Sequence, residues 1–386
     1  MMRQLTSSVL ALSLLSGCLD SESGAKPENE ANVRQPRELP ASLAYAEAFA
    51  GEHILDTPGV MWGWIDMVEY YAFWQLYEAN GDPELLLHIA DYVEDNYAAY
   101  QPIASDWFSP AVLDLLVCTE TGAQDNCDRV ATYDEYFTIS RREEGALVHW
   151  TAADDVNRQI WVDTIFMVGA YMLERARHLP VDEAAVWWDD LVLQFTALDS
   201  YLTDPSTQLM NHGYDFAAEP PLMNEAGAYW GRGNGWYVAM LGFTLRHMPL
   251  DHPGRSALAS IWHNRVAALL PLQDEKGFWH TLVDDPEAYA EASATALFAA
   301  GIASGLSAGL AHDGAAASVA RAIVALDTSI TQEGSRHQLP GISGATVPGS
   351  ADSYREVETR PNIAYGVGAY ILAALENARL RGELTP

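Results

Sequence analysis

The chain has 386 residues, of which 49% are hydrophobic, 53 are acidic and only 21 are lysine or arginine. The hydrophobic fraction predicts a folded chain with a large core rather than a disordered one. The formal net charge of −32 excludes nucleic acid as a partner, because phosphate recognition requires a basic surface. The same charge repels polyanions at long range, so an anionic substrate would need a local cation to hold it.

The N-terminus has the pattern of an export signal. Arg3 precedes a short apolar run, Val9 to Leu15, which is too short to cross a bilayer as a mature helix. Small residues then lead to Cys18, as in a bacterial lipoprotein signal, where cleavage leaves the cysteine as the lipidated first residue. We therefore expect a signal peptide over 1–17 and lipidation at Cys18, which would anchor the exported protein in a membrane of the bacterial cell envelope. The alternative is an ordinary signal peptide with a chance cysteine.

A polar segment separates this signal from the rest of the chain. Residues 18–40 are rich in Glu, Ser, Asn and Pro, a composition that predicts a flexible tether. Residues 41–386 then form one domain. Its two cysteines, Cys118 and Cys127, would pair as a disulfide in an oxidising compartment, and the alternative is two free thiols. No histidine cluster accompanies them, so we expect no zinc site.

Helical periodicity recurs along the domain and predicts twelve helices. In chain order they cover 41–50, 59–79, 84–100, 108–120, 127–140, 158–178, 181–203, 229–248, 254–273, 288–308, 314–332 and 362–382. Helices that are apolar nearly all round, such as the one at Trp236 to Leu245, alternate with amphipathic ones, such as Asp182 to Leu202. This alternation indicates two concentric rings, and the expected fold is an all-α (α/α)6 barrel of six helical hairpins.

The links between these helices alternate in length. Links from a buried helix to the next amphipathic helix are short, whereas links in the other direction are long, at 141–157, 204–228, 274–287 and 333–361. The long loops lead into the N-termini of the inner helices. Functional residues usually lie on such loops, and the N-terminal ends of helices favour an anionic ligand.

Two carboxylates are candidates for catalysis. Asp163 would share an apolar helical stripe with Ile160 and Met167, where burial would raise its pKa and keep it neutral, as a general acid requires. The alternative is an aspartate in a first helical turn that backbone donors satisfy. Asp106 lies just before another predicted helix, where an N-cap is the alternative.

The segment Gly231-Arg232-Gly233-Asn234-Gly235-Trp236 follows Trp230. Its glycines allow the backbone to approach a ligand closely. Arg232 is the candidate clamp for a carboxylate, because a guanidinium binds it through two parallel hydrogen bonds. Trp230 and Trp236 offer faces for a sugar ring. The alternative is a tight loop held by a structural Arg–Asp pair.

Together these segments resemble glycoside hydrolase family 105, the unsaturated rhamnogalacturonyl hydrolases, and more loosely the unsaturated glucuronyl hydrolases. The resemblance spans roughly residues 45–380 and rests on Trp161-Val162-Asp163, His212-Gly213-Tyr214, the Trp230 to Trp236 segment, Glu291 to Thr295 and Tyr365 to Ala369. It implies a six-hairpin toroid, a general acid/base at Asp163 and a second catalytic carboxylate at Asp106. It also places substrate-binding residues at His149, His212, Arg232, Trp161, Trp230 and Trp236.

The implied activity removes the terminal 4,5-unsaturated uronic acid from oligosaccharides that a polysaccharide lyase has produced. Asp163 would protonate C4 and then, as a carboxylate, activate water for attack at C5, while Asp106 steadies the cationic state. The resemblance implies no metal or other cofactor. The alternatives are a lipid-anchored glycan-binding protein without catalysis and a conventional (α/α)6 glycosidase. The sequence leaves open the oligomeric state and the polymer, with rhamnogalacturonan and ulvan as candidates, and Trp150 stands where the family often has a basic residue.

Overall fold

The computed structural model of the protein describes residues 34–55, 61–151 and 158–384. The predicted signal peptide and Cys18 lie outside these ranges. Fourteen α-helices occur in the described residues, and twelve of them correspond to the twelve predicted helices. The helices are α1 (Ala44–Ile54), α2 (Trp64–Asn80), α3 (Pro83–Asn96), α4 (Ser105–Phe108), α5 (Ala111–Thr121), α6 (Gln124–Ile139), α7 (Thr164–His178), α8 (Val181–Leu202), α9 (Gly231–His247), α10 (Arg255–Leu269), α11 (Ala292–Ser307), α12 (Ala315–Ser329), α13 (Ala351–Arg355) and α14 (Ala364–Leu380).

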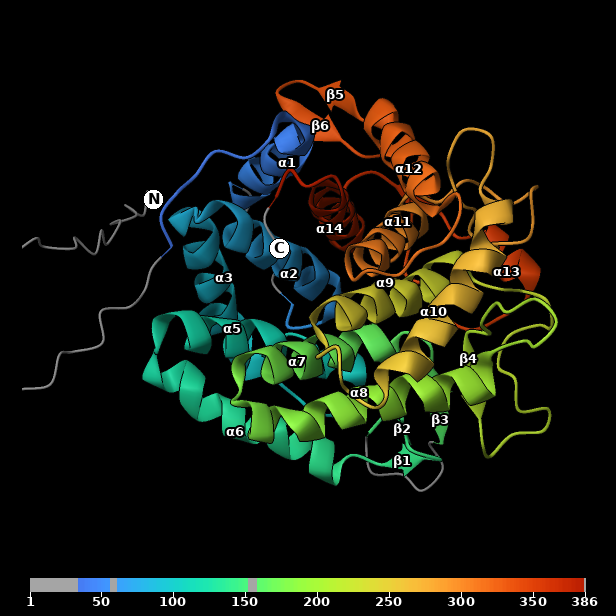
Figure 1. Ribbon diagram of the computed structural model, residues 1–386, viewed down its shortest axis with the longest axis horizontal. Helices are drawn as coiled ribbons and strands as arrows, with labels where there is room; N and C mark the ends of the chain where they lie inside the picture. The colour runs from blue at the N-terminus through green and yellow to red at the C-terminus, as the bar shows by residue number, and fades with distance from the viewer. Residues whose placement is uncertain (1–33, 56–60, 152–157, 385–386) are drawn as a thin grey trace, which may run out of the picture.

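The twelve long helices form two concentric rings (Figure 1). The inner ring runs α2, α5, α7, α9, α11 and α14, each helix packing on the next, and α14 packs back on α2 to close it. The outer ring consists of α1, α3, α6, α8, α10 and α12. Every residue of α9 from Gly231 to Leu245 is buried, whereas α8 is buried along one face only, as expected for helices covered on all sides and on one side. The predicted (α/α)6 barrel is confirmed.

Two glycines allow neighbouring inner helices to touch through their backbones. A Cβ atom on Gly242 of α9 would lie 2.2 Å from the carbonyl oxygen of Gly301, and one on Gly301 of α11 would lie 2.2 Å from that of Val238. Any side chain at either position would therefore force the two helices apart. The inner ring is tightest where these glycines meet.

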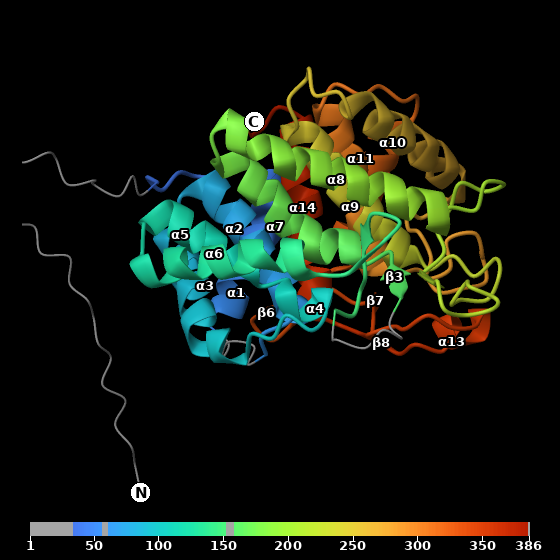
Figure 2. The same cartoon turned by 90° about the horizontal axis from the view of Figure 1, so that it is seen from below.

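The two ends of the barrel differ. The long links cross the end where the inner helices begin, and α4, α13 and the short strands gather there, whereas the C-terminus lies at the opposite end (Figure 2). The strands pair two by two in antiparallel ladders. They are β1 (Arg142–Glu143) with β2 (Ala146–Leu147), β3 (Gln159–Trp161) with β4 (Gly213–Asp215), β5 (Thr331–Glu333) with β6 (Arg336–Gln338), and β7 (Ile342–Ser343) with β8 (Thr359–Arg360).

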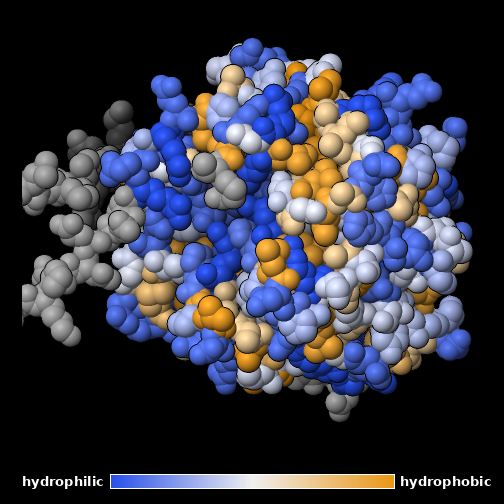
Figure 3. All heavy atoms as spheres, viewed as in Figure 1, coloured by the Kyte–Doolittle hydropathy of each residue, from blue (hydrophilic) through white to orange (hydrophobic). Residues whose placement is uncertain are grey.

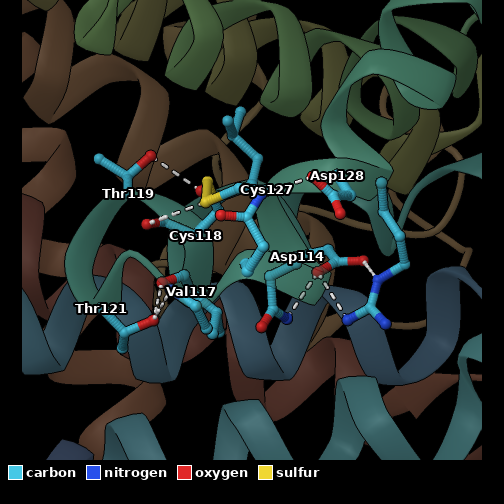
Figure 4. The surroundings of a disulfide bond; sticks show 12 residues. Asp114, Val117, Cys118, Thr119, Thr121, Cys127 and Asp128 are labelled. Atoms are coloured by element: carbon cyan, nitrogen blue, oxygen red, sulfur yellow. Dashed lines mark hydrogen bonds and ion pairs between the residues drawn. A yellow bond between two sulfur atoms is a disulfide. The ribbon is translucent and has the colours of Figure 1, made fainter.

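The hairpin of α5 and α6 is cross-linked. Cys118 and Cys127 form a disulfide with their Cα atoms 4.9 Å apart, which confirms the predicted pair (Figure 4). Beside it, the fully buried Asp114 accepts hydrogen bonds from Asn126 at 2.7 Å and Arg129 at 2.6 Å. The cross-link and this network hold the same two helices together.

Residues 34–40, which we call the strap, lie against the end of the barrel where the inner helices finish. The backbone N–H of Arg37 donates to the carbonyl oxygen of Asn80 at 2.7 Å, and Leu39 packs on the core. The flexible tether predicted over 18–40 includes these residues. In the structure, residues 34–40 contact the barrel. Across the described part of the chain, no helix combines the length and apolarity needed to cross a membrane.

Candidate active site

Asp163 occupies the N-cap position of α7, directly after β3. The helix predicted from residue 158 begins only at Thr164, because Ile160 pairs with Tyr214 in the β3–β4 ladder. The expected helical stripe through Ile160 and Asp163 is therefore wrong. The Asp163 side chain makes no capping hydrogen bond. Within the described residues its Oδ2 accepts no hydrogen bond, and it lies 3.3 Å from Nε2 of His212.

His212 is fixed on three sides. Its Nδ1 lies 2.8 Å from the hydroxyl of Tyr354, and its ring stacks on Trp230 with centroids 4.2 Å apart. Its backbone N–H donates to Oδ1 of Asn224 at 2.9 Å. These contacts direct Nε2 of His212 towards Asp163.

A second histidine, His149, lies beside Asp106. The His149 ring stacks on Trp161 with centroids 4.3 Å apart, and its Nδ1 lies 2.9 Å from Oγ of Ser105. Its Nε2 lies 3.8 Å from Oδ2 of Asp106. Burial, reinforced by the charge of His212 and opposed by that of Asp163, lowers the pKa of His149 to about 4. The ring is therefore neutral at pH 7.

The two carboxylates have different proton affinities. Burial and the charge of Asp163 raise the pKa of Asp106 to about 8. Burial also acts to raise the pKa of Asp163, but the charges of His212 and His149 bring it below its usual value. The expectation that burial keeps Asp163 neutral is therefore wrong for this arrangement. At neutral pH the pair holds one proton, and Asp106 carries it.

A cavity of about 240 Å³ adjoins Asp106. Trp64 and Trp107 line it together with Trp150, and Trp150 meets Trp161 edge to face at 6.2 Å. Asp106 is the one charged residue among the described residues that line the cavity. Indole faces beside a carboxyl group suit a sugar ring, which offers apolar C–H faces and hydroxyl groups.

None of the six predicted substrate-binding residues lines this cavity, and two of them are fully buried in other contacts. Arg232 is fully buried, and its guanidinium donates to the carbonyl oxygens of Ser343 at 2.9 Å and Gly344 at 2.8 Å. It therefore holds the 343–344 backbone where a grip on a substrate carboxylate was expected. Trp236 is also fully buried and packs on Phe166 with centroids 4.7 Å apart, so its ring belongs to the core.

The structure thus brings Asp163, Asp106, His212 and His149 together, with Trp161 and Trp230 stacked on the two histidines. It also adds residues that the sequence did not single out, above all Tyr354, Trp64 and Trp107. Tyr354 lies on α13 inside the long 333–361 loop, where no helix was predicted. No group of three or more His, Cys, Asp or Glu side chains in the described ranges is arranged to hold a metal ion.

Known proteins resemble this chain over most of its length. It is 29% identical over 312 residues to the unsaturated rhamnogalacturonyl hydrolase YesR of Bacillus subtilis, which covers 80% of this chain and 87% of that protein. It is 25% identical over 228 residues to an unsaturated 3S-rhamnoglycuronyl hydrolase of Formosa agariphila, which covers 57% of this chain and 58% of the relative.

A solved structure shares the fold. The crystal structure of a possible member of the GH105 family from Salmonella enterica superposes with a TM-score of 0.78 at 26% sequence identity, covering 93% of this chain and 100% of that one. The family model for Glycosyl Hydrolase Family 88 matches residues 45–381. Because this match includes the whole barrel and both carboxylates, the protein belongs to Glycosyl Hydrolase Family 88 and is a glycoside hydrolase.

Proposed function

We propose that the protein removes the terminal 4,5-unsaturated uronic acid from oligosaccharides that a polysaccharide lyase has released. The observation that carries this proposal is the arrangement of two carboxylates, each beside a histidine: Asp163 lies 3.3 Å from Nε2 of His212, and Asp106 lies 3.8 Å from Nε2 of His149. Burial raises the pKa of Asp106 to about 8, whereas the charges of the two histidines bring that of Asp163 below its usual value despite its burial, so Asp106 is the one that holds a proton. Protonation of an enol ether carbon requires an acid, and the attack of water requires a base. A pair that shares one proton supplies both.

The reaction begins with the proton of the pair. A bound uronate brings its own negative charge and excludes water, and both effects raise the pKa of Asp163. The proton then passes from Asp106 to Asp163, which donates it to C4 as the C4–C5 double bond opens. Positive character develops at C5 and the ring oxygen, and the carboxylate now on Asp106 stabilises it.

Water completes the reaction. Asp163, again a carboxylate, accepts a proton from the water that attacks C5, so that a C5–O bond forms and Asp163 regains its proton. The resulting hemiketal opens at the ring oxygen. The hemiacetal left at C1 then breaks down to an aldehyde and releases the adjacent sugar. One water is consumed in total, and the proton returns to the pair.

We propose that the adjacent sugar is rhamnose and that the polymer is rhamnogalacturonan or ulvan. Two relatives support this, because their names refer to rhamnogalacturonyl and rhamnoglycuronyl substrates. The tryptophans beside Asp106 suit the apolar face of a deoxysugar. The net charge of −32 suits a saline habitat, which favours the algal polymer ulvan.

We also propose that the protein is exported and anchored in the cell envelope through a lipid on Cys18, which lies outside the described residues. The Cys118–Cys127 disulfide supports export, because disulfides persist in oxidising compartments.

A direct test uses defined unsaturated disaccharides. Purified protein is incubated with an unsaturated uronate linked to rhamnose, and the ultraviolet absorbance of the conjugated enol acid is followed. We expect the absorbance to disappear with release of free rhamnose. Unchanged absorbance with measurable binding of the disaccharide would leave a glycan-binding protein and overturn the proposal. A panel that varies the neighbouring sugar then identifies the polymer.

A further inference from the structure

The end of the barrel opposite the carboxylates contains a cavity of about 310 Å³. The strap and the C-terminal ends of α2, α7, α9 and α14 line it. Figure 3, seen from this end, shows strongly hydrophilic residues gathered over the middle of the face. None of the residues that line this cavity contributes to the carboxylate site.

The lining of this cavity is rich in arginine for a strongly acidic protein, with five arginines against three glutamates, Glu38, Glu78 and Glu383. Five of the 21 lysine and arginine residues of the chain line this cavity: Arg34, Arg37, Arg177, Arg246 and Arg379. Part of this charge is structural, because the C-terminal ends of helices carry partial negative charge. Arg177, for example, is bound to the buried Glu174 at 2.7 Å. That pairing leaves no excess of charge at Arg177.

Other guanidinium groups are not fully matched. Glu376 serves two arginines, Arg246 at 3.1 Å and Arg379 at 2.6 Å, so this group of three carries one net positive charge. Burial lowers the pKa of Arg246, Glu376 raises it, and the charges of Arg379 and Arg177 lower it again, so that the net shift is downward. Arg37 forms no ion pair with any other residue that the structure describes. Glu38, Glu78 and Glu383 also line the cavity, so positive charge is in excess only locally, around Arg246 and Arg379.

A buried amide at the cavity has no partner. Gln75 is only 4% exposed and lines the cavity, and its side chain makes no hydrogen bond with the rest of the described chain. His247 lines the same cavity and likewise has no hydrogen-bond partner in the described ranges. A buried polar group without a partner costs about 1 to 3 kcal/mol. The Gln75 side chain is therefore available to bind a ligand in the cavity, and the half-buried His247 lines the same space.

We propose that this cavity binds a tetrahedral oxyanion, sulfate or phosphate. Its donors come from separate segments: Arg37 from the strap, Gln75 from α2, Arg246 from α9 and Arg379 from α14. Donors that surround a volume suit an anion that accepts hydrogen bonds in all directions, whereas a planar carboxylate is best bound by one guanidinium fork. The bound anion would also join the strap to the inner helices.

Calorimetric titration of the full chain with sodium sulfate and, separately, with sodium phosphate tests the site. Sodium chloride at matched ionic strength is the reference. We expect saturable binding of at least one of the two oxyanions, and the stronger one identifies the preferred ligand. Gln75→Leu removes the buried amide with little change of volume, and Arg37→Gln removes an exposed strap cation. Each change should weaken binding about tenfold or more, as expected for the loss of one hydrogen bond to a charged group.

The matched control is Arg321→Gln, which removes one positive charge from an exposed site on α12 and should leave binding unchanged. Three results would each overturn the proposal. The first is the absence of saturable binding beyond the chloride reference. The second is equal weakening by Arg321→Gln, which would indicate a general charge effect. The third is unchanged binding in both Gln75→Leu and Arg37→Gln, which would place the anion elsewhere.

Discussion

The two ends of the barrel differ in their functional side chains, which are carboxylates at one end and arginines at the other. In each case the side-chain charge is opposite in sign to the partial charge of the nearby helix ends. Where the inner helices begin and their dipoles are positive, the half-buried titratable groups include Asp106 and Asp163. Where the helices finish and their dipoles are negative, arginines such as Arg246 and Arg379 line the cavity. Carboxylates are stabilised near helix N-termini and cations near C-termini. One fold thus supports an acidic centre for proton transfer at one end and a basic cavity at the other.

The largest expected effect is a loss of turnover, without a loss of stability, when Asp163 is replaced at the acidic end. Asp163→Asn should lower turnover about a thousandfold, within the range seen when a general acid/base is lost, because the amide can neither donate to C4 nor accept from water. The disappearance of ultraviolet absorbance measures it. Asp327→Asn makes the same change at another partly buried carboxyl, which accepts from Tyr370 at 2.6 Å, and should leave turnover near the original rate. Equal losses in both variants would remove Asp163 from the mechanism.

A change at the arginine-rich end should lower the stability of the protein and leave its turnover unchanged. Glu174→Gln removes the nearer carboxylate of the half-buried Arg177 and leaves it with Glu78 at 3.2 Å, so the free energy of unfolding should fall by up to about 3 kcal/mol, the lower bound for breaking a fully buried pair. Urea unfolding should record this loss, while turnover of the folded fraction stays unchanged. A variant that unfolds normally but turns over slowly would contradict the separation of the two ends.

The same residue sets the pH dependence of stability. Burial acts to raise the pKa of Glu174, but its partners, Arg177 first, hold it well below its usual value. A lowered folded-state pKa gives stability that is present above the unfolded value and is lost as the pH falls. The free energy of unfolding should therefore decrease below about pH 4, near the ordinary pKa of a glutamate. The decrease should be smaller in Glu174→Gln.

The acidic end should have its own pH limit. Asp106, with a pKa of about 8, loses the shared proton as the pH rises through that value, so kcat/KM should fall about tenfold per pH unit above it. In Asp106→Asn no group carries this proton. The rate should be about a hundredfold lower, and the remaining activity should show no decline near pH 8. A wild-type profile that stays flat to pH 10 would rule out Asp106 as the proton store.

The smallest effect concerns the positioning of His212. Tyr354→Phe removes the hydroxyl that lies 2.8 Å from Nδ1 and should lower kcat about tenfold, or about 1.4 kcal/mol, with KM nearly unchanged. Tyr237→Phe removes another buried hydroxyl, which donates to the carbonyl oxygen of Phe195 at 2.9 Å, and serves as the control. If kcat responds equally to both changes, Tyr354 has no special role in positioning His212.

Periodicity predicted the fold because long helices repeat one signal many times. The twelve long helices and their two rings follow from the alternation of buried and amphipathic segments, and errors were confined to the ends. The most important error lies just after residue 158, where Gln159, Ile160 and Trp161 continue the helical pattern of α7. Their true partners are residues 213–215 of β4, and such a distant pairing leaves no local signal.

For the candidate site, the sequence indicated residue types but not their environments. The two carboxylates were candidates from their positions on or before predicted helices, whereas the histidines came from the resemblance to known hydrolases. The pKa values of Asp106 and Asp163 depend on two histidines that the fold brings to them, so the sequence could not assign the proton. The contacts of Arg232 could not be predicted for a similar reason. Its acceptors are the main-chain oxygens of Ser343 and Gly344, which any residue type could supply.

The position of the strap determines how an anchored enzyme would be oriented. The described chain begins at Arg34, at the end of the barrel opposite Asp163. If Cys18 carries a lipid, as we propose, residues 19–33 can reach at most about 50 Å from the membrane at about 3.3 to 3.6 Å per residue. The arginine-rich end would then lie nearest the lipid surface. The cavity beside Asp106, which Trp64, Trp107 and Trp150 line, would face away from the membrane. Oligosaccharides would reach the carboxylates from solution without passing between the enzyme and its own membrane.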